Sequence, residues 1–446
     1  MDEQRVRCLL AQMAAGEQPR VDVAAALDRG RRRLRWRRAG LTAAPLSAIV
    51  VVVLAVTGAV PLGALIGKGH PAPVRTAMHG TTLYVGGGCS NGVTPVSVAT
   101  GKPGKPIWAG PAIVEMVATP DGRTIYAASR STSMVTPVST ATYRAGRPIE
   151  TGIGANPPIA GMAVTPDGRT VYVLDTGRPG TVTPISTATN KAGKPIPIGR
   201  DGTDLQVTSP IAVTPDGKTV YVVNDTLGTV IPISTATNTA SNPIRISGGA
   251  ASIAITPNGR TLYVTAAYSD AITPVTTATN TPGTPIVIPD GLNGLIAVAP
   301  DGKTVYAGSS GPALTPVSTA SNIPGKPVHI EGGPVAIGFT PDGKTAYVVS
   351  SIRAAYGEVV PVSTATNKAG KPITIIGKYA RAIAFTPDGR TGYVANGGSN
   401  TVTPFSTVRN TAGKPIKAGG CPIALIVRPL TWAGTGEAVG QPVRRG

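Results

Sequence analysis

The sequence has few of the residues that metal and cofactor sites usually require. It contains three His and three Cys in 446 residues, which excludes a zinc cluster, a haem protein and a disulfide-dense scaffold. Phe, Trp and Tyr make up 4% of the chain, so a core must be built mainly from Val, Ile, Ala and Tyr. Acidic residues are also scarce: 22 Asp and Glu stand against 41 Lys and Arg, a formal net charge of +19.

The first part of the chain differs from the rest. Seven arginines lie between Arg29 and Arg38, and residues 39–67 carry no charge. The apolar run 41–66 is long enough to cross a bilayer as a helix. Because the arginines precede it, the positive-inside rule places the N-terminus in the cytoplasm and the remainder outside. We predict a basic cytoplasmic segment (1–40), a transmembrane helix (41–66) and a linker (67–81). The alternative is a cleaved signal peptide.

The remainder is built on a repeated phrase. Thr-Pro-Asp-Gly-Arg/Lys-Thr begins at Thr119, Thr165, Thr214, Thr340 and Thr386, with variants at Thr256 and Ala299. A Tyr follows each phrase, and an eighth, Tyr84, precedes them all. From Tyr84 to Tyr393 the mean spacing is about 44 residues, and a fixed period of this length indicates a repeat architecture.

Each unit contains four short β-branched runs, which we name strands A to D. In one unit they are Ile211-Ala-Val-Thr, Thr219-Val-Tyr-Val-Val, Thr229-Val-Ile-Pro-Ile-Ser and Pro243-Ile-Arg-Ile. Pro-Asp-Gly makes a tight turn between A and B, since Pro fixes φ and Gly accepts the left-handed conformation. Four strands at this period are typical of a propeller blade, and no blade can bury both of its faces alone.

The chain ends indicate how the ring closes. Strands B, C and D occur eight times, whereas the complete strand A phrase occurs seven times. Residues 421–429 supply the missing strand A, which we expect to pair with Leu83-Tyr84-Val85. The prediction is an all-β propeller of eight four-stranded blades over residues 82–429, followed by a tail (430–446). Seven blades are the alternative.

The phrases Val171-Tyr-Val, Val220-Tyr-Val-Val-Asn and Thr-Pro-Asp-Gly-Lys/Arg resemble the YVTN family of β-propeller repeats. The resemblance covers about residues 75–429 and is closest to the actinobacterial, membrane-anchored variety. It implies a propeller but not one activity, because related propellers include surface-layer proteins, lactonases and haem-binding domains.

Two cysteines fall at the predicted seam of the ring. Cys89 lies in the loop between strands B and C of the first blade, and Cys421 lies just before the closing strand A. A propeller places these two positions on the same face. Outside the membrane a disulfide persists, so we predict that Cys89 and Cys421 are bonded. The alternative is two unrelated buried cysteines. The third, Cys8, is expected to be a free cytoplasmic thiol.

Charged residues outside the turns lie mostly in loops at the opposite end of the blades, where propellers bind ligands. Within this group the loop 198–210 is the longest and most polar. The candidate ligand-face residues are Arg200, Asp201, Asp204, Asp225, Asp270, Arg353 and Arg381, together with Arg178 and Asp290. We predict no catalytic residues, no cofactor and no metal site. Glu115, near the start of its strand A, is the one acidic candidate for catalysis, and it stands alone.

These observations favour a binding scaffold over an enzyme. The expected partner is a protein, a glycan or a small molecule on the loop end, and no nucleic acid. The alternative is a lactonase-like hydrolase or lyase with a site in the propeller channel. Such chemistry needs clustered carboxylates with a metal or a His base.

The A–B turn end is expected to be basic and to face the membrane, against an anionic lipid or a wall polymer. Seven turn phrases each supply one Lys or Arg, against six turn aspartates. The C–D turns are expected at the same end, and in this prediction they add Lys105, Arg147, Lys194, Lys326, Lys371 and Lys414.

Overall fold

The computed structural model describes residues 80–429, except 131, 152–158, 177–178, 200–209 and 354–355. The predicted cytoplasmic segment, the transmembrane helix, most of the linker and the C-terminal tail lie outside these residues. Within the described ranges, no helix has both the length and the apolar character needed to cross a membrane.

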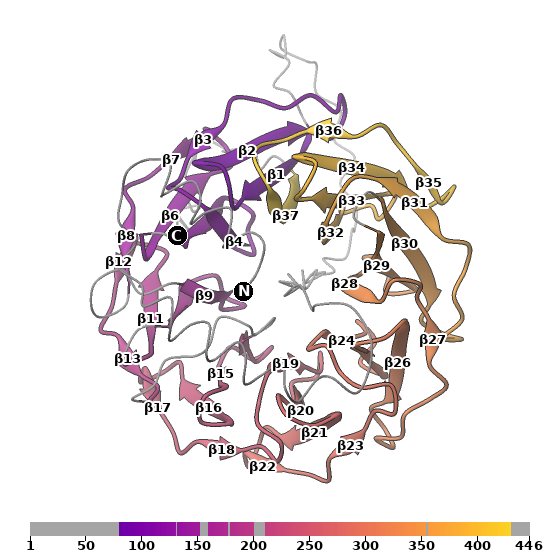
Figure 1. Cartoon of the computed structure of the whole chain (residues 1–446). Helices are drawn as coiled ribbons and strands as arrows, with labels where there is room; N and C mark the ends of the chain where they lie inside the picture. The colour runs from indigo at the N-terminus through magenta and orange to yellow at the C-terminus, as the bar shows by residue number, and fades with distance from the viewer. Residues whose placement is uncertain are drawn as a thin grey trace, which may run out of the picture. The chain divides into compact units, whose positions relative to one another are not determined.

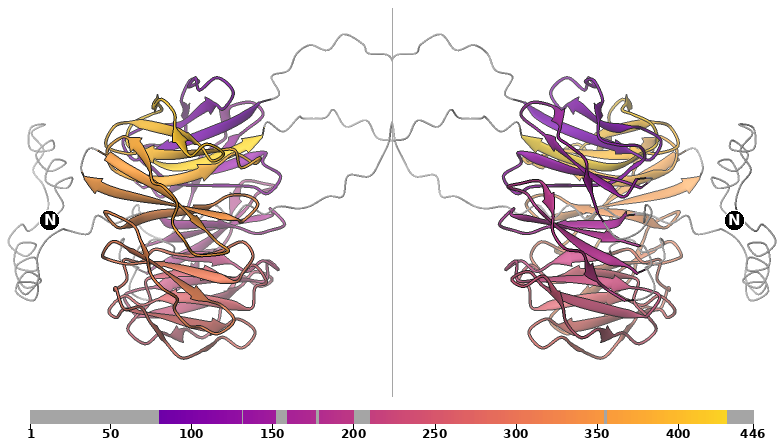
Figure 2. Two further views of the ribbon diagram at one scale, coloured as in Figure 1. Left: turned by 90° about the vertical axis from the view of Figure 1, so that its right-hand side faces the viewer. Right: turned by 90° about the vertical axis from the view of Figure 1, so that its left-hand side faces the viewer.

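The described residues form eight antiparallel β-sheets arranged as blades around a central axis (Figure 1). In each blade strand A is innermost, and strands B, C and D follow outward in chain order. Seen from the side, the blades make a thick disc (Figure 2). The predicted all-β propeller of eight blades is confirmed.

The two inner strand types of each blade are A and B. The A strands are β37 (Pro422–Pro429), β4 (Ile113–Ala118), β9 (Ile159–Val164), β14 (Ile211–Val213), β19 (Ser252–Ile255), β24 (Ile296–Val298), β28 (Pro334–Phe339) and β32 (Ala380–Phe385). The B strands are β1 (Thr81–Gly87), β5 (Thr124–Ser129), β10 (Thr170–Asp175), β15 (Thr219–Asn224), β20 (Thr261–Thr265), β25 (Thr304–Gly308), β29 (Thr345–Arg353) and β33 (Thr391–Asn396).

The two outer strand types are C and D, and most D strands are short or interrupted. The C strands are β2 (Gly92–Ser97), β6 (Met134–Ser139), β11 (Thr181–Ser186), β16 (Thr229–Ser234), β21 (Ala271–Thr276), β26 (Ala313–Ser318), β30 (Tyr356–Ser363) and β34 (Thr401–Ser406). The D strands are β3 (Ile107–Trp108), β7 (Arg144–Ala145) with β8 (Ile149–Glu150), β12 (Lys191–Ala192) with β13 (Ile196–Pro197), β17 (Thr239–Ala240) with β18 (Ile244–Arg245), β22 (Thr281–Pro282) with β23 (Ile286–Val287), β27 (Val328–His329), β31 (Ile373–Ile376), and β35 (Thr411–Ala412) with β36 (Ile416–Lys417).

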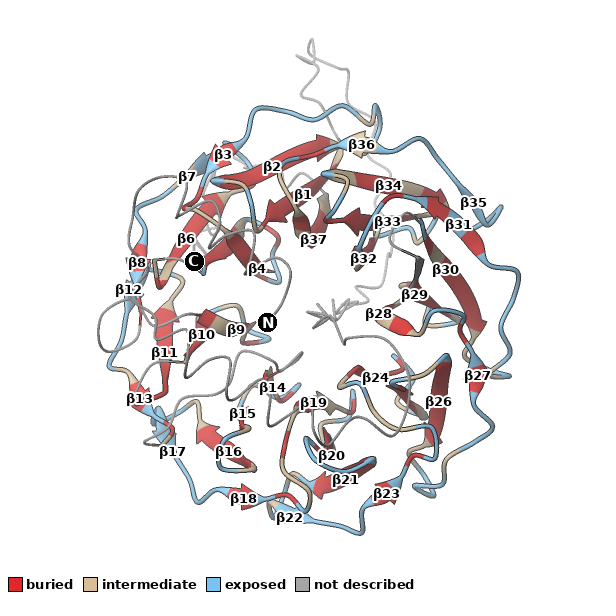
Figure 3. Ribbon diagram, viewed as in Figure 1, coloured by how far each residue is buried: buried red, intermediate tan, exposed pale blue. Residues whose placement is uncertain are grey.

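The hydrophobic core lies between blades rather than within them. Successive residues of a strand point to opposite faces of its sheet. Val171 and Val173 of β10 therefore pack against the preceding blade, in one cluster with Tyr126. Tyr172 and its alternate neighbours pack against the following blade, in one cluster with Val220. Figure 3 shows the buried A, B and C strands and the exposed outer circumference. Each blade thus needs both neighbours.

The ring closes as predicted. Strand β37, from the C-terminal end, pairs with β1 in a register that puts Ile426 opposite Tyr84 and Arg428 opposite Thr82. Cys89 and Cys421 form a disulfide, with Cα atoms 5.2 Å apart and a sequence separation of 332 residues. The predicted bond is therefore present in the structure.

The outer strand bows away from the middle of strand C, where each C strand has a proline. In the second blade, Gly146 donates its N–H to the carbonyl oxygen of Pro137 at 2.7 Å. A Cβ on Gly146 would lie 3.0 Å from the Pro137 ring, so a larger residue would push the segment outward. A glycine covers the strand C proline in the same way in every blade except the fourth, where Ser241 donates its N–H to the carbonyl oxygen of Pro232 at 2.8 Å.

The passage of the outer segment across the strand C proline contradicts the predicted position of six cations at the A–B turn end. The residue after the glycine lies on the outer wall of the disc, opposite the middle of strand C, and not at the A–B turn end. The six cations expected at that end occupy this position: Lys105, Arg147, Lys194, Lys326, Lys371 and Lys414. The expectation is wrong because the chain has already left the C–D turn and begun its return along the wall.

Candidate functional site

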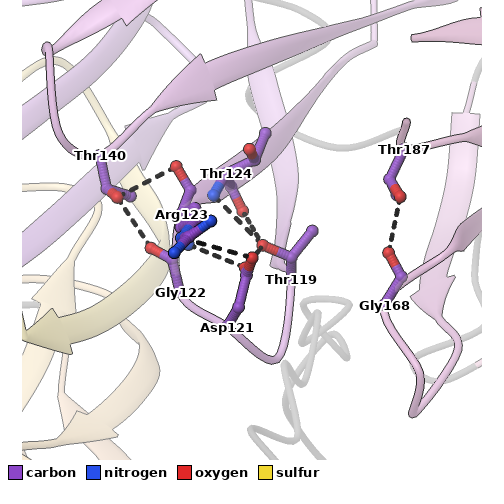
Figure 4. Close-up of polar contacts among 8 residues, drawn as sticks. All are labelled: Thr119, Asp121, Gly122, Arg123, Thr124, Thr140, Gly168 and Thr187. Atoms are coloured by element: carbon purple, nitrogen blue, oxygen red, sulfur yellow. Dashed lines mark hydrogen bonds and ion pairs between the residues drawn. The ribbon is translucent and has the colours of Figure 1, made fainter. Parts of the chain in front are cut away.

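The disc has two different ends. We call the end that carries the A–B turns the turn face, and the end that carries the B–C loops the loop face. On the turn face, Figure 4 shows the Thr-Pro-Asp-Gly phrase of the second blade. Asp121 Oδ1 accepts hydrogen bonds from Thr119 Oγ1 at 2.5 Å and from the Arg123 backbone N–H at 3.0 Å. The aspartate therefore closes its own turn.

A second threonine ties each turn to strand C of the same blade. Thr140, directly after β6, donates its hydroxyl to the carbonyl oxygen of Gly122 at 2.8 Å (Figure 4). Thr187 does the same with Gly168 at 2.7 Å. The same bond recurs in later blades from Thr235, Thr277, Thr319, Thr364 and Thr407. These bonds make the turn face a ring of rigid, similar turns.

The basic side chains of these turns are exposed and only weakly paired with the turn aspartates. The hydrogen bond from Thr214, followed by that from the Lys218 backbone, holds the pKa of Asp216 below its ordinary value. The Lys218 ammonium lies 4.0 Å from the Asp216 carboxylate, and the side chain of Lys218 is 82% exposed. An ion pair this long and this exposed contributes little to stability.

Neighbouring blades are linked on this face by a tyrosine and an asparagine. The Tyr172 hydroxyl donates to Asn238 Oδ1 of the next blade at 2.6 Å. Asn238 has φ of 52°, a left-handed conformation that Asn tolerates better than most residues. Equivalent bonds join Tyr126, Tyr221, Tyr263, Tyr306 and Tyr347 to an Asn of the following blade.

On the loop face the predicted ligand residues are spread over several blades. Asp225 follows β15, and Asp270 lies just before β21, both in B–C loops. Asp270 Oδ1 accepts the Leu292 N–H at 3.2 Å, so its carboxylate also holds the next connection in place. Asp290 lies exposed in that same connection. Arg381 is half-buried on strand β32, at a bulge between Ala380 and Ala382, and not in a loop as predicted.

The remaining predicted residues cannot be placed as side chains. Arg178, Arg200, Asp201 and Asp204 lie outside the described residues. Arg353 ends β29, with only its backbone described. The structure thus neither gathers the candidates into one site nor tests them as a set.

Two carboxyl groups have strongly raised pKa values. Burial raises the pKa of Glu115 on β4 to about 8, although its carboxylate accepts a hydrogen bond from the Met162 backbone on the next inner strand. Burial also raises the pKa of Asp175 to about 7. Asp175 is not among the residues predicted from the sequence. The signal that could have found it is its place three residues after the repeat tyrosine, where other blades have Asn224, Asn396 or Ser129.

Four exposed aromatic side chains lie toward the loop face, on four different blades, whereas Tyr143, 37% exposed, lies in a C–D turn on the turn face. The eight repeat tyrosines are buried, whereas Tyr268 is 81% exposed in its B–C loop and Tyr356 is 53% exposed at the start of β30. Trp108 at the end of β3 and Tyr379 just before β32 are 58% and 39% exposed. In a chain with 4% aromatic residues, four of them are thus exposed toward the loop face, spread around the ring. Across the described ranges, no group of three or more His, Cys, Asp or Glu is placed to hold a metal ion.

No protein-family model and no curated protein matches the sequence. Solved structures do match the fold. The dihydro-heme d1 dehydrogenase NirN aligns with a TM-score of 0.66 at 15% identity, over 80% of this chain and 77% of that one. Citrobacter koseri AztD aligns with a TM-score of 0.60 at 11% identity, over 80% and 100%. Kuenenia stuttgartiensis hydrazine synthase aligns at 0.52 and 20% identity, over 66% and 95%. At these identities the likeness shows the propeller fold alone.

Proposed function

We propose that this chain is a YVTN-type propeller, held outside the cell membrane by a single N-terminal helix, that acts as a binding scaffold. The ligand is a protein, a glycan or a small molecule that contacts the loop face. Residues 1–40 lie in the cytoplasm, residues 41–66 span the membrane, and residues 67–81 link the helix to the disc. The uncharged run 41–66 after the arginine block supports the anchor.

The observation that carries the binding role is the set of exposed aromatics on the loop face. Leaving Tyr268 and Tyr356 in water forgoes the burial that the repeat tyrosines obtain. Tyr and Trp are enriched in binding sites because they supply a large apolar surface and one polar atom at low entropic cost. The rigid ring of turns below them provides a fixed platform.

A thermal-shift screen of the detergent-solubilised chain with sugars, metals and lactones tests this role. A ligand at a hundred times its Kd stabilises the folded state by roughly 2.7 kcal/mol. For a domain of 150–250 residues, each 1 kcal/mol raises Tm by roughly 2–4 °C, and a larger disc moves less. We expect Tyr268→Ala and Tyr356→Ala to reduce the shift. Val408→Ala, similarly exposed in a turn-face loop, is the matched control.

An unchanged shift in both tyrosine variants would contradict binding at the loop face. The alternative function, a lactonase-like hydrolase or lyase, has one supporting observation: Glu115 on the inner strand β4 is a carboxyl whose pKa is about 8. General acid–base catalysis by this carboxyl would still need partner groups around the reacting atoms. Lactone turnover that is abolished by Glu115→Gln would favour the enzyme.

A further inference from the structure

The turn face carries a large excess of positive charge. Every turn phrase places one exposed cation there: Arg123, Arg169, Lys218, Arg260, Lys303, Lys344 and Arg390. The C–D turns add exposed cations at the same end: Lys102, Arg144, Lys191, Lys368 and Arg409. Against these twelve exposed cations stand six turn aspartates, which leaves an excess of six exposed positive charges: Asp121, Asp167, Asp216, Asp301, Asp342 and Asp388.

Six aspartates cannot neutralise twelve cations, and each aspartate also closes its own turn. In each phrase the Asp accepts the backbone N–H of the basic residue, as Lys218 N–H to Asp216 at 3.0 Å illustrates. The paired ammonium or guanidinium groups are 3.9 to 4.0 Å away, and their side chains are 69–85% exposed. The other acids with described side chains lie on the inner strand or toward the loop face: Glu115, Glu150, Asp175, Asp225, Asp270, Asp290, Glu331 and Glu358.

The chain enters and leaves the disc at this same face. Thr81, the first residue of β1, pairs with Pro429, the last residue of β37, and both lie at the A–B turn end. Thirteen residues, 67–79, separate the predicted helix from the first described residue. A chain of that length spans at most about 45 Å. An anchor at 41–66 would therefore hold the turn face, and not the loop face, close to the bilayer.

We propose that the turn face docks on the anionic lipid surface of the bilayer that anchors the chain; this rests on the proposed anchor. The cations meet the lipid phosphates, and the loop face with its exposed aromatics points away from the membrane. Juxtamembrane cations are attracted to anionic lipid, and the attraction falls off within a Debye length of about 10 Å at 0.1 M salt. Docking is therefore sensitive to both lipid charge and salt.

Lysine footprinting of the full chain in vesicles tests this docking. The chain is reconstituted into phosphatidylcholine vesicles with or without phosphatidylglycerol, labelled with a membrane-impermeant amine reagent and digested for mass spectrometry. We expect labelling of Lys218, Lys303 and Lys344 to fall at least about threefold in the anionic vesicles at low salt. It should recover at 1 M salt, where the Debye length is about 3 Å. Lys378 and Lys417, toward the loop face, are internal references.

A matched pair of variants distinguishes the effect of the turn-face cations from the effect of the overall positive charge of the chain. One variant carries Lys218→Gln, Lys303→Gln and Lys344→Gln. The other loses the same charge from the outer wall, as Lys105→Gln, Lys194→Gln and Lys326→Gln. The C–D turn residues Lys102, Lys191 and Lys368 report protection in both. We expect their protection to be lost in the first variant and kept in the second.

The docking would be overturned if the turn-face lysines, like the loop-face lysines, were labelled equally in neutral and in anionic vesicles. Protection that appears only when a soluble anionic wall polymer is added would overturn it as well, in favour of that polymer. Failure of the anchor has a separate signature, since a chain without it is extracted from neutral vesicles by alkaline carbonate. Carbonate extraction overturns the anchor, whereas charge-dependent protection of the turn face still supports docking.

Discussion

At the scale of single residues, Asp175 shows how a repeat position acquires a titratable group. The last residue of β10 is fully buried, and its carboxylate accepts hydrogen bonds from Thr151 Oγ1 at 2.9 Å and Thr183 Oγ1 at 3.4 Å. Two hydroxyl donors do not replace the hydration of a charge, so the pKa rises to about 7. In the next blade Asn224 fills this position and donates to the Ile198 carbonyl oxygen at 3.1 Å.

Asp175→Asn should therefore remove a pH-dependent loss of stability. The folded-state pKa lies above the ordinary 3.8, so wild type loses up to about 1.4 kcal/mol of unfolding free energy per pH unit between pH 4 and 7. Relative to wild type, the variant should gain stability as pH rises over this window, by a few kcal/mol at most. Urea unfolding at pH 4.5 and pH 8 measures this difference.

Asp216→Asn is the matched control, because the pKa of Asp216 is lowered and the sign reverses. Its stabilisation is present above pH 4 and is lost as pH falls through the lowered pKa. Between pH 4.5 and pH 8 the stability difference between the control and wild type should therefore stay constant. An Asp175→Asn effect that is the same at both pH values would show that the buried carboxyl does not titrate in this range.

At the scale of elements, the first blade departs from the repeat at the positions where its surroundings differ. The other blades place Asn at the left-handed C–D turn position, except Tyr143, which stacks on Tyr84. The first blade has Gly101 there, with φ of 65°. Among the described residues, Tyr393 of the last blade consequently has no hydrogen-bond partner like those of its equivalents. The seam between the last and first blades therefore lacks the hydrogen bond from a repeat Tyr to an Asn of the next blade.

Gly101→Asn should supply this hydrogen bond between the last and first blades. A Cβ at residue 101 would meet only Ile416 Cδ1, at an ordinary 3.5 Å, and Asn already adopts the required φ in six other blades. One hydrogen bond to the Tyr393 hydroxyl and a stiffer unfolded chain should together raise the unfolding free energy by about 1 kcal/mol or more. The urea midpoint measures the gain.

Gly101→Ala is the comparison, since Ala adds the Cβ but no acceptor. Ala at a left-handed φ costs roughly 1–2 kcal/mol. An Asn variant that is no more stable than the Ala variant would contradict a stabilising hydrogen bond between residue 101 and the Tyr393 hydroxyl.

The elements were predictable from sequence where the determinants are local. The Thr-Pro-Asp-Gly phrase contains its own turn chemistry, because Asp121 accepts hydrogen bonds from Thr119 and from the Arg123 backbone within that phrase. The path of strand D was not predictable, because the bow between β7 and β8 depends on Gly146 crossing the Pro137 ring of another strand. For the same reason Arg381 was expected in a loop: the bulge that places it on β32 arises from pairing with β33. Prediction of the candidate site was limited in the same way, because the burial that raises the pKa of Asp175 depends on tertiary packing and is not visible in the local sequence.

At the scale of the whole molecule, closure relies on one strand pairing and one covalent bond between the chain ends. Replacing both Cys89 and Cys421 by Ser should lower the unfolding free energy by about 2–5 kcal/mol, because the bond closes a loop of more than 300 residues. Denaturation of wild type and of the double variant, with and without reductant, measures this loss. A variant as stable as oxidised wild type would show that the β1–β37 pairing alone closes the ring.

Protease access to intact spheroplasts tests the central claim most directly. The proposed scaffold lies outside the cell membrane, held by residues 41–66, with the Arg29–Arg38 block inside. Added protease should degrade the propeller while a cytoplasmic marker protein survives, and an epitope placed before residue 29 should be protected. Survival of the propeller together with the cytoplasmic marker, followed by degradation of both after lysis, would contradict the account.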